Sequence, residues 1–284
     1  RRNMSATGNS THGYFGGGWG PISIMDKVTY STDTTAQLPG APLTNTTSES
    51  AATGNADAGY FSGGFNPSGD LSTVNKLTYS SETTVAVPGA ALSLARQDHA
   101  GASARANGVP LPEPPAATPT PQTASGEGAA TSTLGYFGGG MAGPGGLSPE
   151  LSLVDKLTYS TETTARVPGA NSPETMGEQG AIGNSTDGYF GGGFQPGNAP
   201  SYAKSTMYKL TYASETTATL PTAAALTAVR RYMSAVGNTD AGYFVAGYDG
   251  SPISKTDKIT YSSDTTAAVP GANSTDRKST RLNS

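Results

Sequence analysis

Short segments in which apolar and polar residues alternate recur along the chain, and a turn follows each of them. Lys76-Leu77-Thr78-Tyr79 alternates with period two and ends at a Ser/Thr-rich turn, which is typical of a β-strand. The segment Thr-Thr-Ala-Arg-Val-Pro at residues 163–168 predicts the outgoing strand of a hairpin, because proline ends a ladder of backbone hydrogen bonds. Helical periodicity is confined to a weak alanine-rich stretch at residues 223–231. The pattern therefore predicts an all-β fold.

Three sequence blocks occur five times in the same order. The first is Gly-Tyr-Phe, which opens a glycine-rich stretch at Gly13, Gly59, Gly135, Gly188 and Gly242. The second joins lysine to an apolar residue, threonine and tyrosine, and its lysines are Lys27, Lys76, Lys156, Lys209 and Lys258. The third is Asp/Glu-Thr-Thr, which begins at Asp33, Glu82, Glu162, Glu215 and Asp264 and closes on Pro39, Pro88, Pro168, Pro221 and Pro270. The separation from lysine to proline is 12 residues in every copy, whereas that from the block phenylalanine to lysine ranges from 12 to 19. Constant spacing indicates a structural hairpin, and variable spacing indicates a surface loop.

A fourth strand is expected before each Gly-Tyr-Phe block. Residues 233–236 lead into a Gly237-Asn238 turn and are predicted to pair with Tyr243-Phe244, and similar turns stand at residues 8–9, 54–55 and 183–184. Four short strands in a repeat of about 50 residues match one blade of a β-propeller. We therefore expect one propeller domain over residues 1–275, with five four-stranded blades at about 1–43, 44–94, 95–172, 173–226 and 227–275. The blades form either a completed ring or an open arc, which would leave two exposed edges.

The repeats resemble the Kelch type of propeller blade. Its order of basic residue, small residues, glycine, aromatic and turn residue is followed by Arg231, Ser234, Ala235, Gly242-Tyr243-Phe244, Tyr261 and Asp264. The late tryptophan of that repeat is missing, so the blade is a divergent one. The pair of segments at residues 135–140 and 154–160 also resembles repeats in virion and tail-associated proteins of marine bacteriophages. These resemblances imply a Kelch-like β-propeller in an extracellular or virion setting.

Three parts of the chain do not follow the repeat as it stands. Residues 104–132 are rich in proline and are predicted to form a disordered insertion between the first two strands of blade three, with a frameshift as the alternative. Residues 2–9 match 231–238, so the chain is expected to start inside a blade. Residues 276–284 resemble the translation of a sequencing-library adapter and are expected to be a non-native tail, with a short basic tail as the alternative.

Composition excludes several classes of function. The net charge is −4 and only 13% of the 284 residues are charged, so no nucleic-acid partner is expected. The absence of cysteine removes thiolate metal sites and cysteine nucleophiles, and two histidines leave little material for a His-rich metal centre. The longest apolar run, at residues 223–229, is too short to span a bilayer, so no membrane insertion is expected. No cofactor is predicted.

A large side chain stands six residues after each Gly of Gly-Tyr-Phe, where the variable loop begins. These residues are Trp19, Phe65, Met141, Phe194 and Tyr248. A closed propeller would place them as a ring near one face, where aromatic side chains suit a sugar or a protein partner. The alternative is that they fill the wedges between neighbouring blades. Polar groups of the same loops, Tyr202 and Asp249 above all, with Asn66, Asp70 and Gln195, are candidates for hydrogen bonds to the ligand.

The other candidate motifs point to structure. The repeated lysine and acidic residue, such as Lys27 and Asp33, occur five times, whereas a catalytic site needs a unique constellation. We interpret them as turn capping and cross-strand pairing. The Gly-Gly-Gly runs lack the Gly-Lys-Ser/Thr of a phosphate loop and are expected to allow close backbone approach.

No catalytic residues are predicted. Without cysteine the chain lacks the Cys–Tyr cofactor of galactose-oxidase-like Kelch enzymes, and neither His12, in a turn, nor His99, beside the insertion, is a credible base. We therefore expect a non-enzymatic binding or structural propeller in a virion or cell-surface protein, which presents loops to a glycan or protein, with virion proteins as further partners. The alternatives are a bacterial or environmental lectin or adhesin unrelated to phage, and a fragment of an enzyme whose active site is on missing blades.

Overall fold

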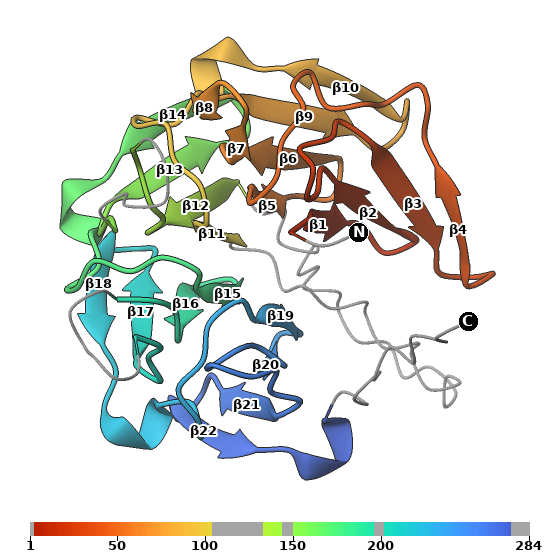
Figure 1. Cartoon of the computed structure of the whole chain (residues 1–284). Helices are drawn as coiled ribbons and strands as arrows, with labels where there is room; N and C mark the ends of the chain where they lie inside the picture. Colours follow the sequence, from red (N-terminus) through yellow and green to blue (C-terminus); the bar gives the residue numbers. More distant parts are fainter. Residues whose placement is uncertain (1–2, 104–132, 144–149, 196–201, 274–284) are drawn as a thin grey trace, which may run out of the picture.

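The chain forms an all-β propeller of five four-stranded antiparallel sheets, as the repeat predicts. The computed structural model describes residues 3–103, 133–143, 150–195 and 202–273. Within each blade the strands follow one another in sequence order, from the innermost to the outermost (Figure 1). The five blades form an arc that does not close into a ring. The predictions for residues 104–132 and 276–284 lie outside the described residues.

Equivalent strands occupy equivalent places in the five blades. The innermost strands are β1 (Ser5–Gly8), β5 (Ala51–Gly54), β11 (Ala100–Ser103), β15 (Gly180–Gly183) and β19 (Ser234–Gly237). The second strands are β2 (His12–Gly16), β6 (Ala58–Ser62), β12 (Leu134–Gly138), β16 (Asp187–Gly191) and β20 (Ala241–Val245). The third are β3 (Met25–Thr29), β9 (Val74–Thr78), β13 (Val154–Thr158), β17 (Met207–Thr211) and β21 (Thr256–Thr260). The outermost are β4 (Thr34–Gln37), β10 (Thr83–Ala86), β14 (Thr163–Arg166), β18 (Thr216–Thr219) and β22 (Thr265–Ala268).

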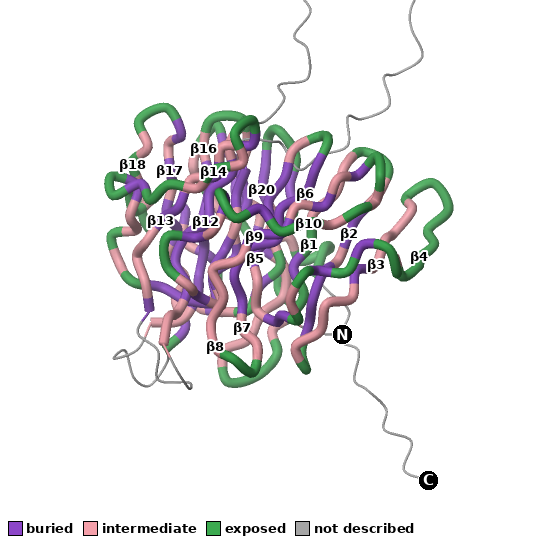
Figure 2. Tube along the Cα trace, turned by 90° about the horizontal axis from the view of Figure 1, so that it is seen from above, coloured by how far each residue is buried: buried purple, intermediate pink, exposed green. Residues whose placement is uncertain are grey.

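The remaining elements are short. A small hairpin, β7 (Phe65–Asn66) with β8 (Gly69–Asp70), stands in the loop of blade two. One-turn 3₁₀ helices follow four of the outer strands: η1 (Pro88–Ala90), η2 (Pro168–Ala170), η3 (Thr222–Ala224) and η4 (Pro270–Ala272). Figure 2 shows that buried residues run through the stack of blades and that exposed ones gather in the loops and turns.

The Gly-Asn turns close the innermost hairpin as predicted. The side-chain oxygen Oδ1 of Asn238 accepts hydrogen bonds of 2.9 Å from the backbone N–H groups of Asp240 and Ala241. Asn9, Asn55 and Asn184 make the same pair of bonds in their blades. An asparagine side chain that satisfies two backbone donors fixes the turn, and with it the register of β19 against β20.

Neighbouring blades stack their tyrosines. The tyrosine of each Gly-Tyr-Phe block lies against the tyrosine that follows the third strand of the next blade, with ring centroids 4.9–5.1 Å apart in the pairs Tyr14–Tyr79, Tyr60–Tyr159, Tyr136–Tyr212 and Tyr189–Tyr261. The inner member of each pair is at most 1% exposed. The repetition of the two tyrosines in every blade therefore serves the junctions between blades.

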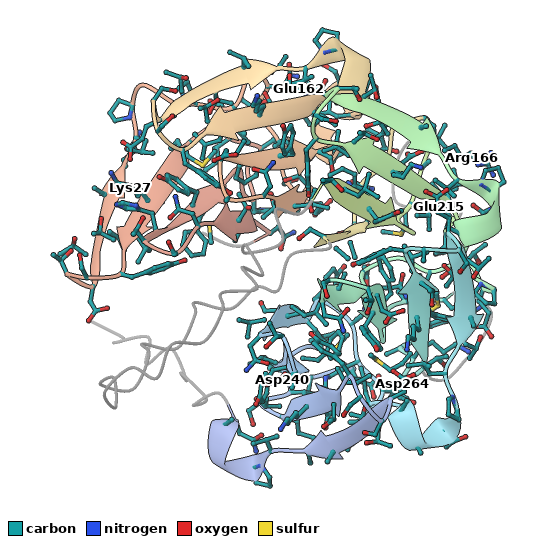
Figure 3. All side chains as sticks on the ribbon, turned by 180° about the vertical axis from the view of Figure 1, so that it is seen from behind. Lys27, Glu162, Arg166, Glu215, Asp240 and Asp264 are labelled. Carbon is teal, nitrogen blue, oxygen red and sulfur yellow. The ribbon has the colours of Figure 1, made fainter. Side chains whose placement is uncertain are left out.

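The repeated lysine and acidic residue pair between blades, which corrects the prediction of cross-strand pairing within a hairpin. Lys27 of blade one binds Glu82 of blade two at 2.6 Å, and Lys209 of blade four binds Asp264 of blade five at 2.9 Å. Lys76–Glu162 and Lys156–Glu215 are the equivalent pairs, and Figure 3 shows Glu162, Glu215 and Asp264 at successive junctions. The acidic residues do lie in turns, with φ near +50°. The left-handed backbone directs each carboxylate toward the preceding blade.

The phenylalanine of each Gly-Tyr-Phe block packs into the preceding blade. Phe190 lies beside Gly138, and Phe244 beside Gly191, where an added Cβ would stand about 3 Å from the ring. The glycines that follow bring backbones together as expected: the N–H groups of Gly64 and Gly140 donate to carbonyls of the next blade at 2.9 Å. Phe15, in the first blade of the described chain, is only half-buried.

Two buried ion pairs stand inside blades three and five. Arg96 and Asp155 are both fully buried and lie 2.8 Å apart, and Arg230 and Asp257 repeat the arrangement at 2.7 Å. Each guanidinium also donates to the carbonyl of the block phenylalanine, Phe137 or Phe244. The buried basic residue of blade five is therefore Arg230, whereas the side chain of Arg231, which carried the Kelch resemblance, is 26% exposed. Neither pair is predicted from the sequence.

Candidate functional site

One face of the propeller gathers the variable loops. Because the two inner strands of a blade are antiparallel, the loop that leaves the second strand lies at the same end as the segment that enters the first. We call this end of the molecule the loop face. The Gly-Asn turns and the Asp/Glu-Thr-Thr turns lie at the opposite end.

Four of the five predicted large side chains occupy equivalent positions on the loop face. Each forms an isolated backbone bridge with a residue that precedes the inner strand of its blade, in the pairs Phe65–Ser48, Met141–Gln97, Phe194–Gly177 and Tyr248–Arg231. All four are half-buried. Trp19 departs from this arrangement, because its indole stays 57% exposed. The bridge between Ile22 and Thr47 is a different contact, which joins blade one to blade two.

Three of the predicted residues meet around Arg231. Its guanidinium carbon lies 4.9 Å from the ring centroid of Phe194 and 5.5 Å from that of Tyr248. Phe194 in turn contacts Tyr202, with ring centroids 5.6 Å apart. We name this group, together with Tyr232, whose ring centroid is 5.2 Å from the same guanidinium, the Arg231 cluster. It brings loops of blades four and five together.

Glu178 fixes the polar atoms of the Arg231 cluster. One carboxylate oxygen accepts a bond of 2.9 Å from Arg231, and the other accepts one of 2.7 Å from the hydroxyl of Tyr232. The ring of Tyr232 is nevertheless 51% exposed, and that of Tyr202 is 44% exposed. The side chains of Tyr202 and Tyr232 therefore face solvent, while Arg231 is held in place by its ion pair with Glu178.

The other predicted hydrogen-bonding residues lie apart from this cluster or serve the loops themselves. Asp70 accepts a bond of 2.8 Å from the backbone N–H of Gly143 in the next blade. Asn66 accepts one from the backbone of Ser68, and Gln195 donates its backbone N–H to Tyr202. Asp249 lies in the turn of the last loop, where its N–H donates to Ser251.

A second feature of the loop face lies at the centre of the propeller. One residue from each blade, two positions before the inner strand begins, adopts a left-handed backbone: Asn3, Glu49, Asp98, Glu178 and Tyr232. The backbone N–H of each of the last four donates to the carbonyl of its counterpart in the preceding blade, at 2.8–3.1 Å. We call these five residues the axial ring. They line a hollow of about 250 Å³ together with the residues that follow them.

The axial ring was not identified from sequence, although a signal exists. Glu49, Asp98 and Glu178 each stand ten residues after the repeat proline, and Tyr232 stands eleven after it. The position varies in residue type within a segment of nearly constant length. Variation of side chain on a fixed backbone is what a binding position shows.

Three members of the axial ring, Glu49, Asp98 and Glu178, bring acidic side chains to the hollow, and the pKa of Asp98 is raised there. Burial raises the pKa of Asp98 to about 8, and the negative charges of Glu49, Glu178 and Asp70 act in the same direction, against Arg231. Burial also raises the pKa of Glu178, but its bonds to Tyr232 and Arg231 oppose the shift. In the described part of the chain no group of three or more His, Cys, Asp or Glu side chains is arranged to hold a metal ion.

The histidines lie in structural positions. His99 is buried beneath the hollow, where its Nε2 lies 2.9 Å from the hydroxyl of Ser62, and burial beside Arg96 holds its pKa well below the usual value. His12 lies at the opposite end of blade one, 2.8 Å from the hydroxyl of Thr11. The two side chains do not come together.

Replacement of Asp98 by asparagine is expected to stabilise the fold in alkaline solution. Because the pKa of Asp98 is raised in the folded state, the folded chain holds a proton that the unfolded chain releases between about pH 4 and pH 8. The free energy of unfolding of the parent chain therefore falls as pH rises through this window. Asp98→Asn should gain about 1–3 kcal/mol over the parent at about pH 9 and little at about pH 4, by urea unfolding at each pH. A constant difference between the two proteins across pH would contradict this account of Asp98.

Comparison with models of known protein families finds no match for this chain, and comparison with curated proteins finds none either. Among the residues that the structure describes, no helix has the length and apolar character to cross a bilayer. The fold and the loop face are therefore the observations on which a function can be based.

Proposed function

We propose that this chain is a non-enzymatic binding module whose loop face binds carbohydrate. The observation that supports the proposal best is the Arg231 cluster, in which the exposed Tyr232 lies beside the guanidinium of Arg231 and the carboxylate of Glu178, and the exposed Tyr202 lies against Phe194. Tyr232 of the cluster and Glu178, which binds it, also line the axial hollow. Aromatic surface and hydrogen-bonding groups are thus contiguous.

The chemistry of this surface suits a sugar. The C–H face of a pyranose is apolar and packs on an aromatic ring, while its hydroxyls need donors and acceptors in fixed places. Tyr232 offers the ring, and the carboxyl groups of Asp98 and Glu49 line the hollow beside it.

The site is held in shape before a ligand arrives. The backbone of Tyr232 donates to Glu178 at 3.1 Å, its hydroxyl donates to the same residue, and Arg231 lies between Phe194 and Tyr248. A side chain that is already ordered loses little entropy on binding, which favours affinity from a small contact area.

The setting of the module is proposed from the sequence resemblance. A virion or cell-surface protein that recognises a glycan is our proposal, and a lectin or adhesin unrelated to phage would use the same surface. In either setting the role proposed for the described residues is to bind a glycan, and no catalytic step is proposed.

A glycan array with the purified chain tests the proposal. We expect binding to at least one class of glycan, and we expect Tyr232→Ala to weaken that binding by about 10-fold or more, because the stacking surface is lost. Tyr232→Phe should keep most of the affinity, since it removes only the hydroxyl that binds Glu178.

Tyr30→Ala is the matched control. This tyrosine is 44% exposed, as Tyr232 is 51%, but it follows β3 at the opposite end of the blade. Its replacement should leave glycan binding unchanged. Absence of any bound glycan, or equal loss in the Tyr30 and Tyr232 variants, would overturn the proposed function.

A further inference from the structure

The four junctions between blades share one set of contacts. In each contact one partner always comes from the earlier blade and the other from the later blade. The earlier blade contributes the block tyrosine and the lysine, and the later blade contributes the second tyrosine, the acidic residue and the phenylalanine. The set recurs from blade one to blade five, so every inner blade carries both halves. The first and last blades each carry one half that no described residue completes by these contacts.

Blade five presents the half that an earlier blade would use. Lys258 stands where Lys27 and Lys209 bind an acidic residue, and no ion pair is formed by it within the described part of the chain. Tyr243 is half-buried, whereas its four counterparts are at most 1% exposed. Val236 of the inner strand is 54% exposed and adds apolar surface to the same sheet.

Blade one presents the opposite half. Asp33 has the left-handed backbone of its counterparts and is exposed, with no ion pair to another described residue. Phe15 is half-buried, whereas its counterparts Phe61, Phe137, Phe190 and Phe244 are at most 2% exposed. Thus the edge of blade one carries an acidic group and an aromatic ring where the edge of blade five carries a lysine and an apolar sheet.

The two edges do not meet within one molecule. Blades one and five flank the opening of the arc (Figures 1 and 3). A cavity of about 360 Å³ lies among the inner strands of the propeller. Phe15 of blade one and Val236 of blade five both line it. The complementary surfaces are therefore both available to another molecule.

We propose that the blade-five edge of one copy of this chain binds the blade-one edge of a second copy. Lys258 of one copy would pair with Asp33 of the other, and Phe15 would pack against the sheet of Tyr243. Val245 stands where Gly138 or Gly191 receives a phenylalanine ring, so Phe15 must pack beside this side chain. Because the two surfaces differ, the contact is head-to-tail, and the assembly is a ring if the rotation closes and a filament if it does not.

Charge reversal tests the proposal. Lys258→Glu leaves two acidic groups facing each other at the contact, and Asp33→Lys leaves two basic ones. Sedimentation equilibrium over about a hundredfold range of protein concentration measures the association. We expect the parent chain to self-associate, and we expect the association constant of each variant alone to be lower by about 10-fold or more. An equimolar mixture of the two variants should recover the parent association, because each edge then meets its opposite charge on the other variant.

Lys255→Glu is the matched control, since it makes the same change of charge on an exposed lysine of the loop face. It should associate as the parent does, and all three variants should keep the parent's thermal unfolding midpoint at a concentration low enough for the parent to be monomeric. A parent chain that stays monomeric over the whole range would overturn the proposal. So would association that the edge variants do not weaken, or that their mixture does not restore. None of these results bears on glycan binding, which is tested separately.

Discussion

Replacement of Arg96 by methionine is expected to lower the free energy of unfolding by about 3–5 kcal/mol. The guanidinium and the carboxylate of Asp155 are fully buried and 2.8 Å apart. Methionine fills much of the same space but leaves the carboxylate with one backbone partner, the N–H of Ser93 at 3.2 Å. A buried charge without its counter-ion costs far more than the pair itself contributes, so the loss should be seen directly in urea unfolding.

The double variant Arg96→Met/Asp155→Asn separates the unpaired charge from the change in packing. Asparagine keeps an acceptor for the backbone of Ser93 and carries no charge, as Asn75 does at the same place in blade two. We expect the double variant to be more stable than Arg96→Met alone by at least about 1 kcal/mol. Equal stability of the two variants would show that packing around Arg96, and not the charge of Asp155, sets the loss.

Truncation of the block phenylalanine is expected to have a large effect inside the arc and a small one at its edge. Phe137→Ala should cost about 3–5 kcal/mol, because the ring is 0% exposed between blades two and three and its removal leaves a cavity. Phe15→Ala should cost about 1 kcal/mol, because the same position in blade one has no preceding blade to cover it.

The comparison is made at low protein concentration, where a second copy does not cover Phe15. Both variants remove the same side chain from the same strand position, so intrinsic strand preference cancels between them. Chemical unfolding followed by tyrosine fluorescence gives both free energies. An equal loss of stability in Phe15→Ala and Phe137→Ala would mean that Phe15 is packed as tightly as Phe137. That result would contradict the half-burial of Phe15 in the structure.

Much of the architecture could be predicted from the repeats. A constant separation from lysine to proline indicates a hairpin whose length cannot change, and the Gly-Asn turn indicates the register of the inner pair. These are local properties, because strand pairing within a blade joins residues close in sequence. The five sheets and their strand order therefore follow from the sequence pattern.

The candidate site was predicted only in part. The choice of Phe194, Tyr202 and Tyr248 identified three members of one cluster, because all three belong to the variable loops. Arg231, which joins them, was assigned instead to a strand position of the Kelch pattern. Glu49 and Asp98 were not identified, because their constant spacing from the repeat proline does not show that they meet, and their proximity arises only when neighbouring blades come together.

The sequence by itself determined the number of blades, the four strands of each and the face on which the loops lie, since short-range pairing and turn chemistry decide these. Tertiary structure alone decided the partners across the junctions. Lys27 binds Glu82 and not Asp33 because the left-handed turn directs the carboxylate toward the preceding blade. It also decided that the arc stays open, because closure depends on the rotation between whole sheets, which no single repeat encodes.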